Sequence, residues 1–138
     1  MIGPPCQRPS EREVAVMNMV GDSGASACGV STRRVDGTVV ITVTGTIDMV
    51  TVAQLEAGIE SAMADAPARV VIDLLGVQFL ASIGIGALVA VHHHPTVRLA
   101  VVADGPATAR PLQLVGVADV IDVCPTLDDA LKTVLVQR

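Results

Sequence analysis

Ser82 is the residue of this 138-residue chain whose type and position most invite a chemical role. It opens an apolar stretch long enough for three turns of helix, and it stands where a helix N-cap is expected. There its hydroxyl would accept a hydrogen bond from a backbone N–H of the first turn, a contribution of about 1 kcal/mol. From the residues alone, Ser82 is therefore interpreted first as a helix cap.

Three other patterns could carry chemistry, and each is weak. The consecutive histidines 92–94 would point about 100° apart on a helix, so they would not converge on one metal ion. A Ser-His-Asp hydrolase is not favoured, because Ser82 lacks a G-x-S-x-G elbow and the histidines lie at the far end of its own helix. Gly84 and Gly86 lack the third glycine and the acid of a dinucleotide site. We expect these glycines to allow another backbone to approach closely. Because all three patterns are weak, we predict that the protein has no metal, no cofactor and no enzymatic activity.

The composition indicates one domain whose partners are proteins. At this length a domain buries roughly two thirds of its unfolded surface. Hydrophobic residues make up 51% of the chain and Phe79 is its one aromatic residue, so an aliphatic core is expected, in an α/β or α+β domain. The net charge of −5 argues against nucleic acid or an anionic membrane as partner.

Cysteine usage and hydropathy indicate a cytoplasmic protein. Cys6, Cys28 and Cys124 are odd in number and far apart, so neither a disulfide framework nor a zinc site is indicated, and a reducing cytosol is expected. The longest apolar run, 79–91, is shorter than the roughly 20 residues that cross a bilayer. The N-terminus shows no secretory signal pattern.

The N-terminal part of the sequence predicts an extension followed by a β-hairpin. Residues 1–25 mix prolines, glycines and scattered charges without a sustained period, so we expect a disordered extension and a domain at 26–138. Strands are predicted at 27–35 and 38–44. Asp36-Gly37 between them is a strong hairpin signal.

A strand and two helices are predicted in the middle of the chain. Asp48 is expected to cap the first helix, and its buried face repeats at spacings of three and four. The apolar run 70–74 predicts a strand covered on both faces, with a turn at Gly76. A second helix should run from its cap at Ser82 to near His93. The buried face of the first helix is expected to comprise Val52, Leu55, Ile59 and Met63.

The last part of the chain continues the alternation. Strands are predicted at 97–103 and 120–123, with a short helix at 106–115 between them and a final helix capped by Thr126. The order is β-β-α-β-α-β-α-β-α, which predicts an α/β domain with a mixed, mostly parallel sheet. The buried stripe of the final helix is expected to comprise Leu127, Ala130, Leu131, Val134 and Leu135.

Residues 79–86, Phe-Leu-Ala-Ser-Ile-Gly-Ile-Gly, resemble the signature of the STAS domain as found in bacterial anti-sigma factor antagonists. That signature reads aromatic, apolar, Asp, Ser, Ser or Thr, Gly, apolar, Gly, and Ala81 replaces its aspartate. Residues 44–48, Thr-Gly-Thr-Ile-Asp, resemble the family's T-G-E-L-D. The resemblance covers the chain from about Val30 to its end and implies a STAS fold, which has the predicted order of elements. A later family pattern is matched by Arg110, Leu112 and Gly116-Val117.

The resemblance implies a function and a site. In such proteins the serine that corresponds to Ser82 is phosphorylated by the anti-sigma partner. The loop that corresponds to residues 44–48 lies beside that serine at one end of the sheet. The chain would then bind an anti-sigma factor, a serine kinase that uses ATP, and free a sigma factor for transcription. The partner-binding residues expected on this basis are Thr46, Asp48, Ala81, Ser82, Ile83, Gly84 and Ile85.

Two alternatives stay open at this point. The chain could be a sensory STAS module that binds a nucleotide or another small ligand, which calorimetry with purine nucleotides would detect. An enzyme would need a carboxylate and a histidine beside Ser82. The sequence also leaves a weak homodimer open.

Overall fold

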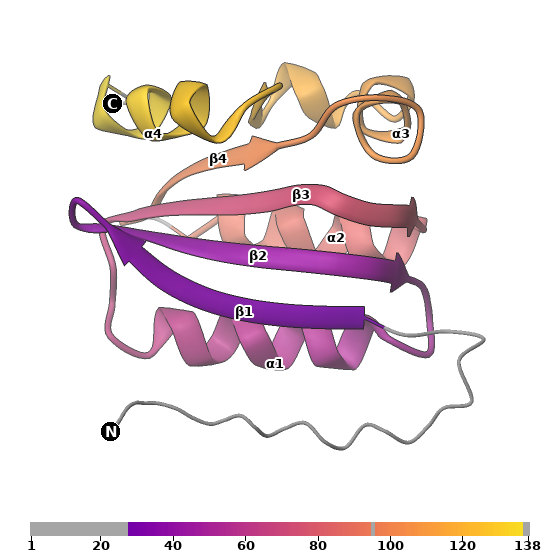
Figure 1. Cartoon of the computed structure of the whole chain (residues 1–138), viewed down its shortest axis with the longest axis horizontal. Helices are drawn as coiled ribbons and strands as arrows, with labels where there is room; N and C mark the ends of the chain where they lie inside the picture. The colour runs from indigo at the N-terminus through magenta and orange to yellow at the C-terminus, as the bar shows by residue number, and fades with distance from the viewer. Residues whose placement is uncertain (1–27, 95, 137–138) are drawn as a thin grey trace.

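Residues 28–94 and 96–136 are described by the computed structural model, which shows one mixed β-sheet with helices packed on both of its faces (Figure 1). The sheet has five strands in the order β1-β2-β3-β4-β5, of which β1 and β2 are antiparallel and the other neighbours parallel. In chain order the elements are β1 (Cys28–Val35), β2 (Thr38–Ile47), α1 (Val52–Met63), β3 (Arg69–Leu80), α2 (Ser82–His92), β4 (Arg98–Val102), α3 (Ala109–Leu114), the 3₁₀ turn η2 (Val117–Asp119), β5 (Asp122–Cys124) and α4 (Leu127–Val136).

The predicted order of a hairpin followed by alternating helices and strands is confirmed, with η2 as an addition. The hairpin turn is formed by Asp36 and Gly37, whose φ angles of 51° and 82° lie in the left-handed region. A two-residue hairpin turn requires this conformation, and glycine adopts it without strain. The predicted extension, residues 1–25, lies outside the described residues.

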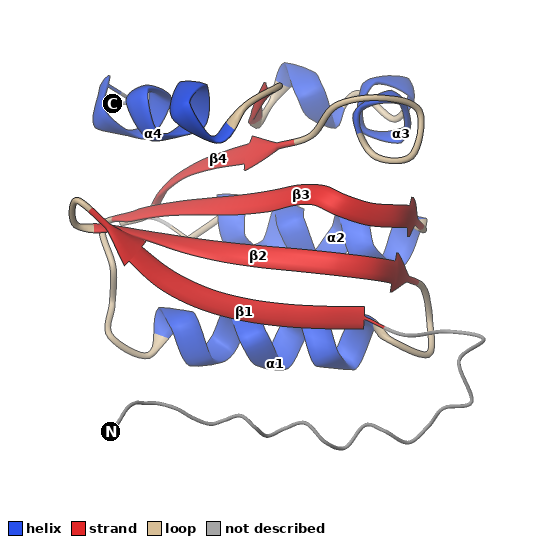
Figure 2. Cartoon of the chain, in the orientation of Figure 1, coloured by secondary structure: helices blue, strands red, loops and turns tan. Residues whose placement is uncertain are grey.

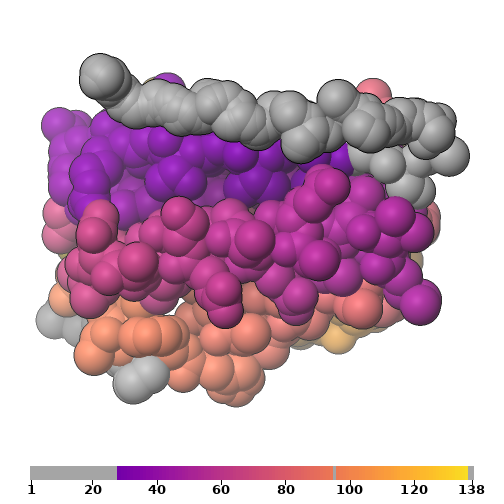
Figure 3. All heavy atoms as spheres, turned by 90° about the horizontal axis from the view of Figure 1, so that it is seen from below, coloured from indigo at the N-terminus to yellow at the C-terminus, as the bar shows by residue number. Residues whose placement is uncertain are grey.

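Side-chain alternation along the central strands divides the core into two layers. On β2, Val39, Ile41 and Val43 face the larger layer, which α1 and α2 cover. Val40 faces the other side, where residues of β3, β4, β5 and α4 surround it. Successive strand residues point to opposite faces, so a strand covered on both sides is apolar throughout. Figure 2 shows the helices on the two sides of the sheet, and Figure 3 shows the molecule from the α1 side.

The central strands are longer than the sequence predicts. A strand end at Leu74 and a turn at Gly76 were expected, yet β3 continues through Gly76 to Leu80. β2 likewise runs past Thr44 to Ile47, and the register of the β2–β3 ladder shifts at two points near its end. A Cβ on Gly76 would lie 2.8 Å from Cγ2 of Thr44. Gly76 therefore allows a close approach of two strands at an irregularity and does not form a turn.

The C-terminal part follows its prediction more closely. α2 ends at His92, one residue from the expected stop. α3 begins three residues after the expected start at 106, which places Pro111 in its first turn, where the missing N–H is not needed. The Thr126 hydroxyl accepts from the N–H of Asp129 at 3.2 Å, which confirms the cap of α4. Leu135 was expected to be buried but is 55% exposed, because Ala130 and Val134 turn the neighbouring side of α4 to the sheet.

Candidate functional site

Two loops meet where β2 and β3 end. Ile47, the last residue of β2, pairs with Leu80, the last residue of β3. One residue later, the N–H of Ala81 donates to the carbonyl of Ile47 at 2.8 Å. The β2–α1 loop, residues 48–51, and the start of α2 therefore lie side by side, which is the arrangement that the family resemblance implies.

Asp48 organises the β2–α1 loop. Its Oδ1 accepts from the N–H groups of Val50 at 2.9 Å and Thr51 at 3.1 Å. The Thr51 side chain is fully buried; its hydroxyl donates to the carbonyl of Thr46 at 2.7 Å and accepts from the N–H of Asp48 at 3.0 Å. One carboxylate and one hydroxyl thus hold the loop in a single shape.

The prediction that Asp48 is the N-cap of the first helix is wrong. Thr51 occupies the N-cap position, and α1 begins at Val52. A turn over residues 48–51 separates strand from helix, and the carbonyl of Asp48 accepts from the N–H of Val52 at 2.9 Å. The Asp48 side chain caps this turn in the manner of an Asx-turn, so it is engaged before the helix begins.

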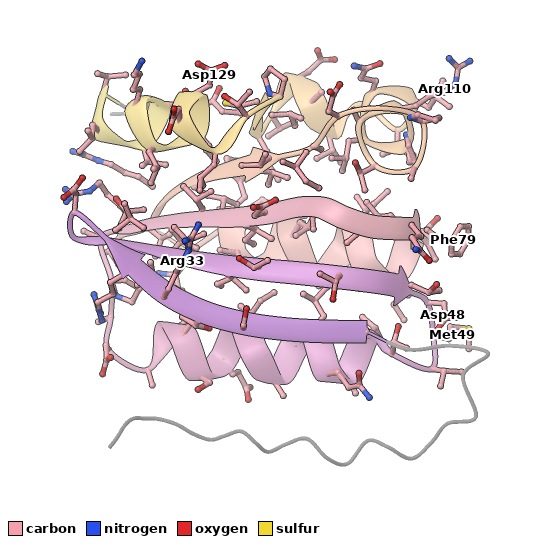
Figure 4. All side chains as sticks on the ribbon, viewed as in Figure 1. Arg33, Asp48, Met49, Phe79, Arg110 and Asp129 are labelled. Atoms are coloured by element: carbon pink, nitrogen blue, oxygen red, sulfur yellow. The ribbon has the colours of Figure 1, made fainter. Side chains whose placement is uncertain are left out.

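The two residues at the tip of this loop are apolar and exposed. Met49 is 81% exposed and Val50 is 74% exposed. Figure 4 shows Met49 beside Asp48, at the same end of the molecule as Phe79. The sequence reasoning missed both residues because they precede the periodic face of α1. The signal that could have found them is an apolar pair placed directly after a turn-forming aspartate.

Ser82 is exposed, but it is the first residue of α2 and not its cap. Ala81 is the single residue between β3 and α2, and it holds the N-cap position with φ −82° and ψ 164°. Its carbonyl accepts from the N–H of Gly84 at 2.9 Å. Because the chain passes from strand to helix without a longer loop, the extended conformation that a cap requires falls on Ala81.

Two residues that were expected to touch a partner, Gly84 and Ile85, are buried in the first turn of α2. A Cβ on Gly84 would collide with Ile47 and lie 2.9 Å from Cδ1 of Leu80, so the missing side chain lets α2 pack closely on the strand ends. Gly86 differs, because it is exposed and a Cβ there would meet no described atom within 4 Å. A close approach is found at Gly84 alone, and it is made by the side chains of Ile47 and Leu80 and not, as was expected, by another backbone.

Exposed apolar side chains lie in both segments at the end of the sheet where Ser82 stands. Phe79 is 54% exposed and Ile83 is 43% exposed, and with Met49 and Val50 they make up what we call the apex patch. Such clusters, rimmed by polar groups, are typical of protein–protein contact surfaces. The apex patch therefore has the character of a surface to which another protein docks.

Cys28 lies at the same end of the sheet, where it pairs with Gly45 across the β1–β2 ladder. Burial, and then the negative charge of Asp48, raises the pKa of the Cys28 thiol from 9.0 to about 11. The thiol is therefore protonated near neutral pH and is a weak nucleophile.

The histidines stand at the other end of α2 from Ser82. Ten residues of helix separate Ser82 from His92, a rise of about 15 Å, so the histidine that a hydrolase requires does not lie beside this serine. Across residues 28–94 and 96–136, no three His, Cys, Asp or Glu side chains converge to hold a metal ion. The helices within these ranges are all too short or too polar to cross a membrane.

Residues 29–130 match the sequence model of one protein family, described as the STAS domain. This chain belongs to the STAS domain family. The resemblance seen at 79–86 and 44–48 is thereby confirmed.

Three relatives and solved structures to which this chain is similar are named as anti-sigma factor antagonists. The anti-sigma-F factor antagonist RsfB of Mycobacterium tuberculosis, in strains CDC 1551 / Oshkosh and ATCC 25618 / H37Rv, is 40% identical over 101 residues, which are 72% of this chain and 83% of RsfB. A crystal structure of an anti-sigma factor antagonist from Mycobacterium paratuberculosis has a TM-score of 0.76 at 41% identity, covering 79% of this chain and 95% of that one. The unphosphorylated form of the anti-sigma factor antagonist SpoIIAA has a TM-score of 0.64 at 21% identity, covering 80% of this chain and 99% of SpoIIAA, and supports the fold alone.

Proposed function

We propose that this STAS domain is an anti-sigma factor antagonist, which binds an anti-sigma factor and thereby frees a sigma factor for transcription. The observation that carries the proposal is the apex patch, which presents four apolar side chains to solvent at the end of the sheet where the exposed Ser82 lies. The identity of 40% to RsfB and 41% to the M. paratuberculosis antagonist supports the same role.

The β2–α1 loop suits such a role because it is ordered before any partner arrives. The bonds of Asp48 and Thr51 fix the backbone that carries Met49 and Val50. Association costs free energy when loops must be ordered, so a loop that is already held contributes more of its contact energy to binding. Two exposed apolar side chains on a fixed loop are therefore well placed to anchor a partner.

The partner that we infer is an anti-sigma factor with serine kinase activity toward this chain, acting in the cytoplasm, and the chain itself has no catalytic role. Its contacts would come from the apex patch together with Thr46, Asp48, Ala81 and Ser82. Gly84 and Ile85 would support this surface from beneath. Weak homodimerisation stays a prediction.

Phosphorylation of Ser82 would act as the switch. A phosphate adds about −1.5 to −2 charges, and at the exposed first residue of α2 it would be favoured by the helix dipole, so the fold would tolerate it. About 4 Å from a partner carboxylate, each pair of unit charges costs on the order of 4 kcal/mol at an effective dielectric near 20. Since 1.4 kcal/mol is tenfold in affinity, binding would weaken by roughly a thousandfold.

Calorimetry with the anti-sigma factors encoded in the same genome tests the proposal. The unsubstituted chain and Ser82→Ala should bind, whereas Ser82→Glu should lose the partner and keep its circular dichroism spectrum. Mass spectrometry after incubation with the kinase and ATP should place the phosphate on Ser82. Phosphate on another residue, or tight binding by Ser82→Glu, would remove Ser82 from the switch. Failure of the unsubstituted chain to bind any of these factors would overturn the antagonist role.

A further inference from the structure

An open groove with a volume of about 710 Å³ lies between α1 and α2. No residue of the apex patch lines it, so docking at that patch does not explain the groove. It lies on the side of the sheet that α1 and α2 cover, where Figure 3 shows α1 in magenta with the α2–β4 region beneath it in salmon and orange. Its walls are aliphatic and mostly small: Ala53, Ala57 and Ile59 from α1, and Ala87, Ala90 and Val91 from α2.

The shape and lining of this groove suit a helix better than a small molecule. Small-ligand sites enclose their ligand and fix it with a few convergent polar groups. This groove is open to solvent, and most of its lining side chains are apolar. Ala53, Ala57 and Ala90 are exposed, so a third helix could approach to the spacing of about 8 to 10 Å at which helices pack.

The rim of the groove is acidic. Glu56 and Glu60 line it on the α1 side, one turn apart, and both are exposed. Like charges at this spacing destabilise a helix by a few tenths of a kcal/mol, so the pair has no benefit for α1 itself. His94 is the one Lys, Arg or His side chain among its lining residues. The rim is therefore complementary to a partner that carries Lys or Arg.

The groove also continues the apex patch. Ile83 of the patch lies four residues before Ala87 and seven before Ala90, spacings that place all three on one side of α2. On α1, Ala53 follows the β2–α1 loop by two residues. A partner bound at the apex patch would reach the groove without leaving the surface.

We propose that the groove receives an amphipathic helix of the anti-sigma partner, with apolar side chains toward the alanines and Lys or Arg toward Glu56 and Glu60. This rests on the proposed function and extends its contact surface from the end of the sheet along α1 and α2. It identifies the partner element by its chemistry, as a basic amphipathic helix.

A matched pair of lysine substitutions on α1 tests the groove in the full-length chain. Ala57→Lys places bulk and positive charge inside the groove, whereas Gln54→Lys adds the same side chain to an exposed position of α1 that does not line it. Calorimetry with the anti-sigma factor should show Ala57→Lys at least about tenfold weaker and Gln54→Lys unchanged. The double variant Glu56→Gln, Glu60→Gln should also bind more weakly, with a shallower dependence on salt. Circular dichroism and melting temperatures confirm that the variants fold.

The outcomes separate the groove from the antagonist role. If Ala57→Lys binds as the unsubstituted chain does, or if Gln54→Lys loses as much affinity, the groove is not the docking site; loss of binding by Ser82→Glu would then leave the antagonist role standing. If the unsubstituted chain binds no anti-sigma factor, both proposals fall.

Discussion

Replacing Gly86 by alanine should stabilise the protein, whereas the same change at Gly84 should destabilise it. Gly86 lies in the interior of α2, is exposed, and a Cβ there would meet no described atom within 4 Å. Glycine costs a helix interior about 0.5 to 1 kcal/mol relative to alanine, because the unfolded glycine has more conformations to lose. The free energy of unfolding of Gly86→Ala should rise by about that amount.

At Gly84 the same gain in helix propensity is outweighed by packing. The new Cβ would collide with Cγ2 of Ile47 and lie 2.9 Å from Cδ1 of Leu80, and both of these side chains are buried. Extra atoms in a packed core cost about 1 to 3 kcal/mol, because neighbouring side chains are forced out of their preferred rotamers. After the propensity gain is subtracted, Gly84→Ala should lose up to about 2.5 kcal/mol.

Urea unfolding measures both changes, with Ala90→Gly as a control. Ala90 is an exposed residue of the same helix, so its replacement by glycine should cost about 1 kcal/mol and calibrate the propensity term. Equal stability of Gly84→Ala and Gly86→Ala would refute the close contact between α2 and the strand ends. A Gly86→Ala protein less stable than the unsubstituted one would show that its Cβ does not face open space.

Three further experiments test the end of the sheet that carries the candidate site. Thr51→Val removes the hydroxyl that donates to the carbonyl of Thr46, so the free energy of unfolding measured in urea should fall by about 1 to 3 kcal/mol. Thr51→Ser keeps the hydroxyl and should lose less. A Thr51→Val protein with an unchanged free energy of unfolding would contradict the contribution of that hydrogen bond. Because the folded pKa of Cys28 is about 11 and its ordinary value is 9.0, the unfolded chain loses this proton first. Stability should therefore decline between pH 9 and about 11, and a Cys28→Ala profile parallel to the original would exclude this cause. Ala81→Asp supplies an N-cap acceptor, so calorimetric melting should occur at a higher temperature, and no change would mean that the carboxylate does not reach the first-turn N–H groups.

Much of the fold could be predicted because its signals are local. Asp36-Gly37 specifies the hairpin through its own backbone preferences, and spacings of three and four place Val52, Leu55 and Ile59 on the buried side of α1. The continuation of β3 through Gly76 is not local, because it depends on pairing with the end of β2. A glycine in an apolar run has the same local pattern whether it forms a turn or admits a neighbouring strand.

The candidate site could be located from the sequence, but its details could not. The family signature marks residues 44–48 and 79–86, and the structure brings these two segments side by side, as the resemblance implies. The predicted N-cap residues of α1 and α2 were wrong. Local preference favours Asp48 and Ser82 as caps, whereas the first residue of each helix depends on where the preceding strand ends. The exposure of Met49 depends on the same turn, which forms through hydrogen bonds that no periodicity reveals.

Ala81 stands where the family signature has an aspartate, and the backbone explains why Ser82 keeps its position without that acid. The N–H of Ala81 donates to Ile47 and its carbonyl accepts from Gly84, so main-chain atoms alone fix the start of α2. The side chain at position 81 instead sets the charge beside the serine hydroxyl. With alanine there, a phosphate on Ser82 would meet the positive end of the helix dipole without a carboxylate at position 81 to repel it. The replacement makes the proposed docking surface more apolar, and under the proposed switch an added phosphate would act chiefly on the partner.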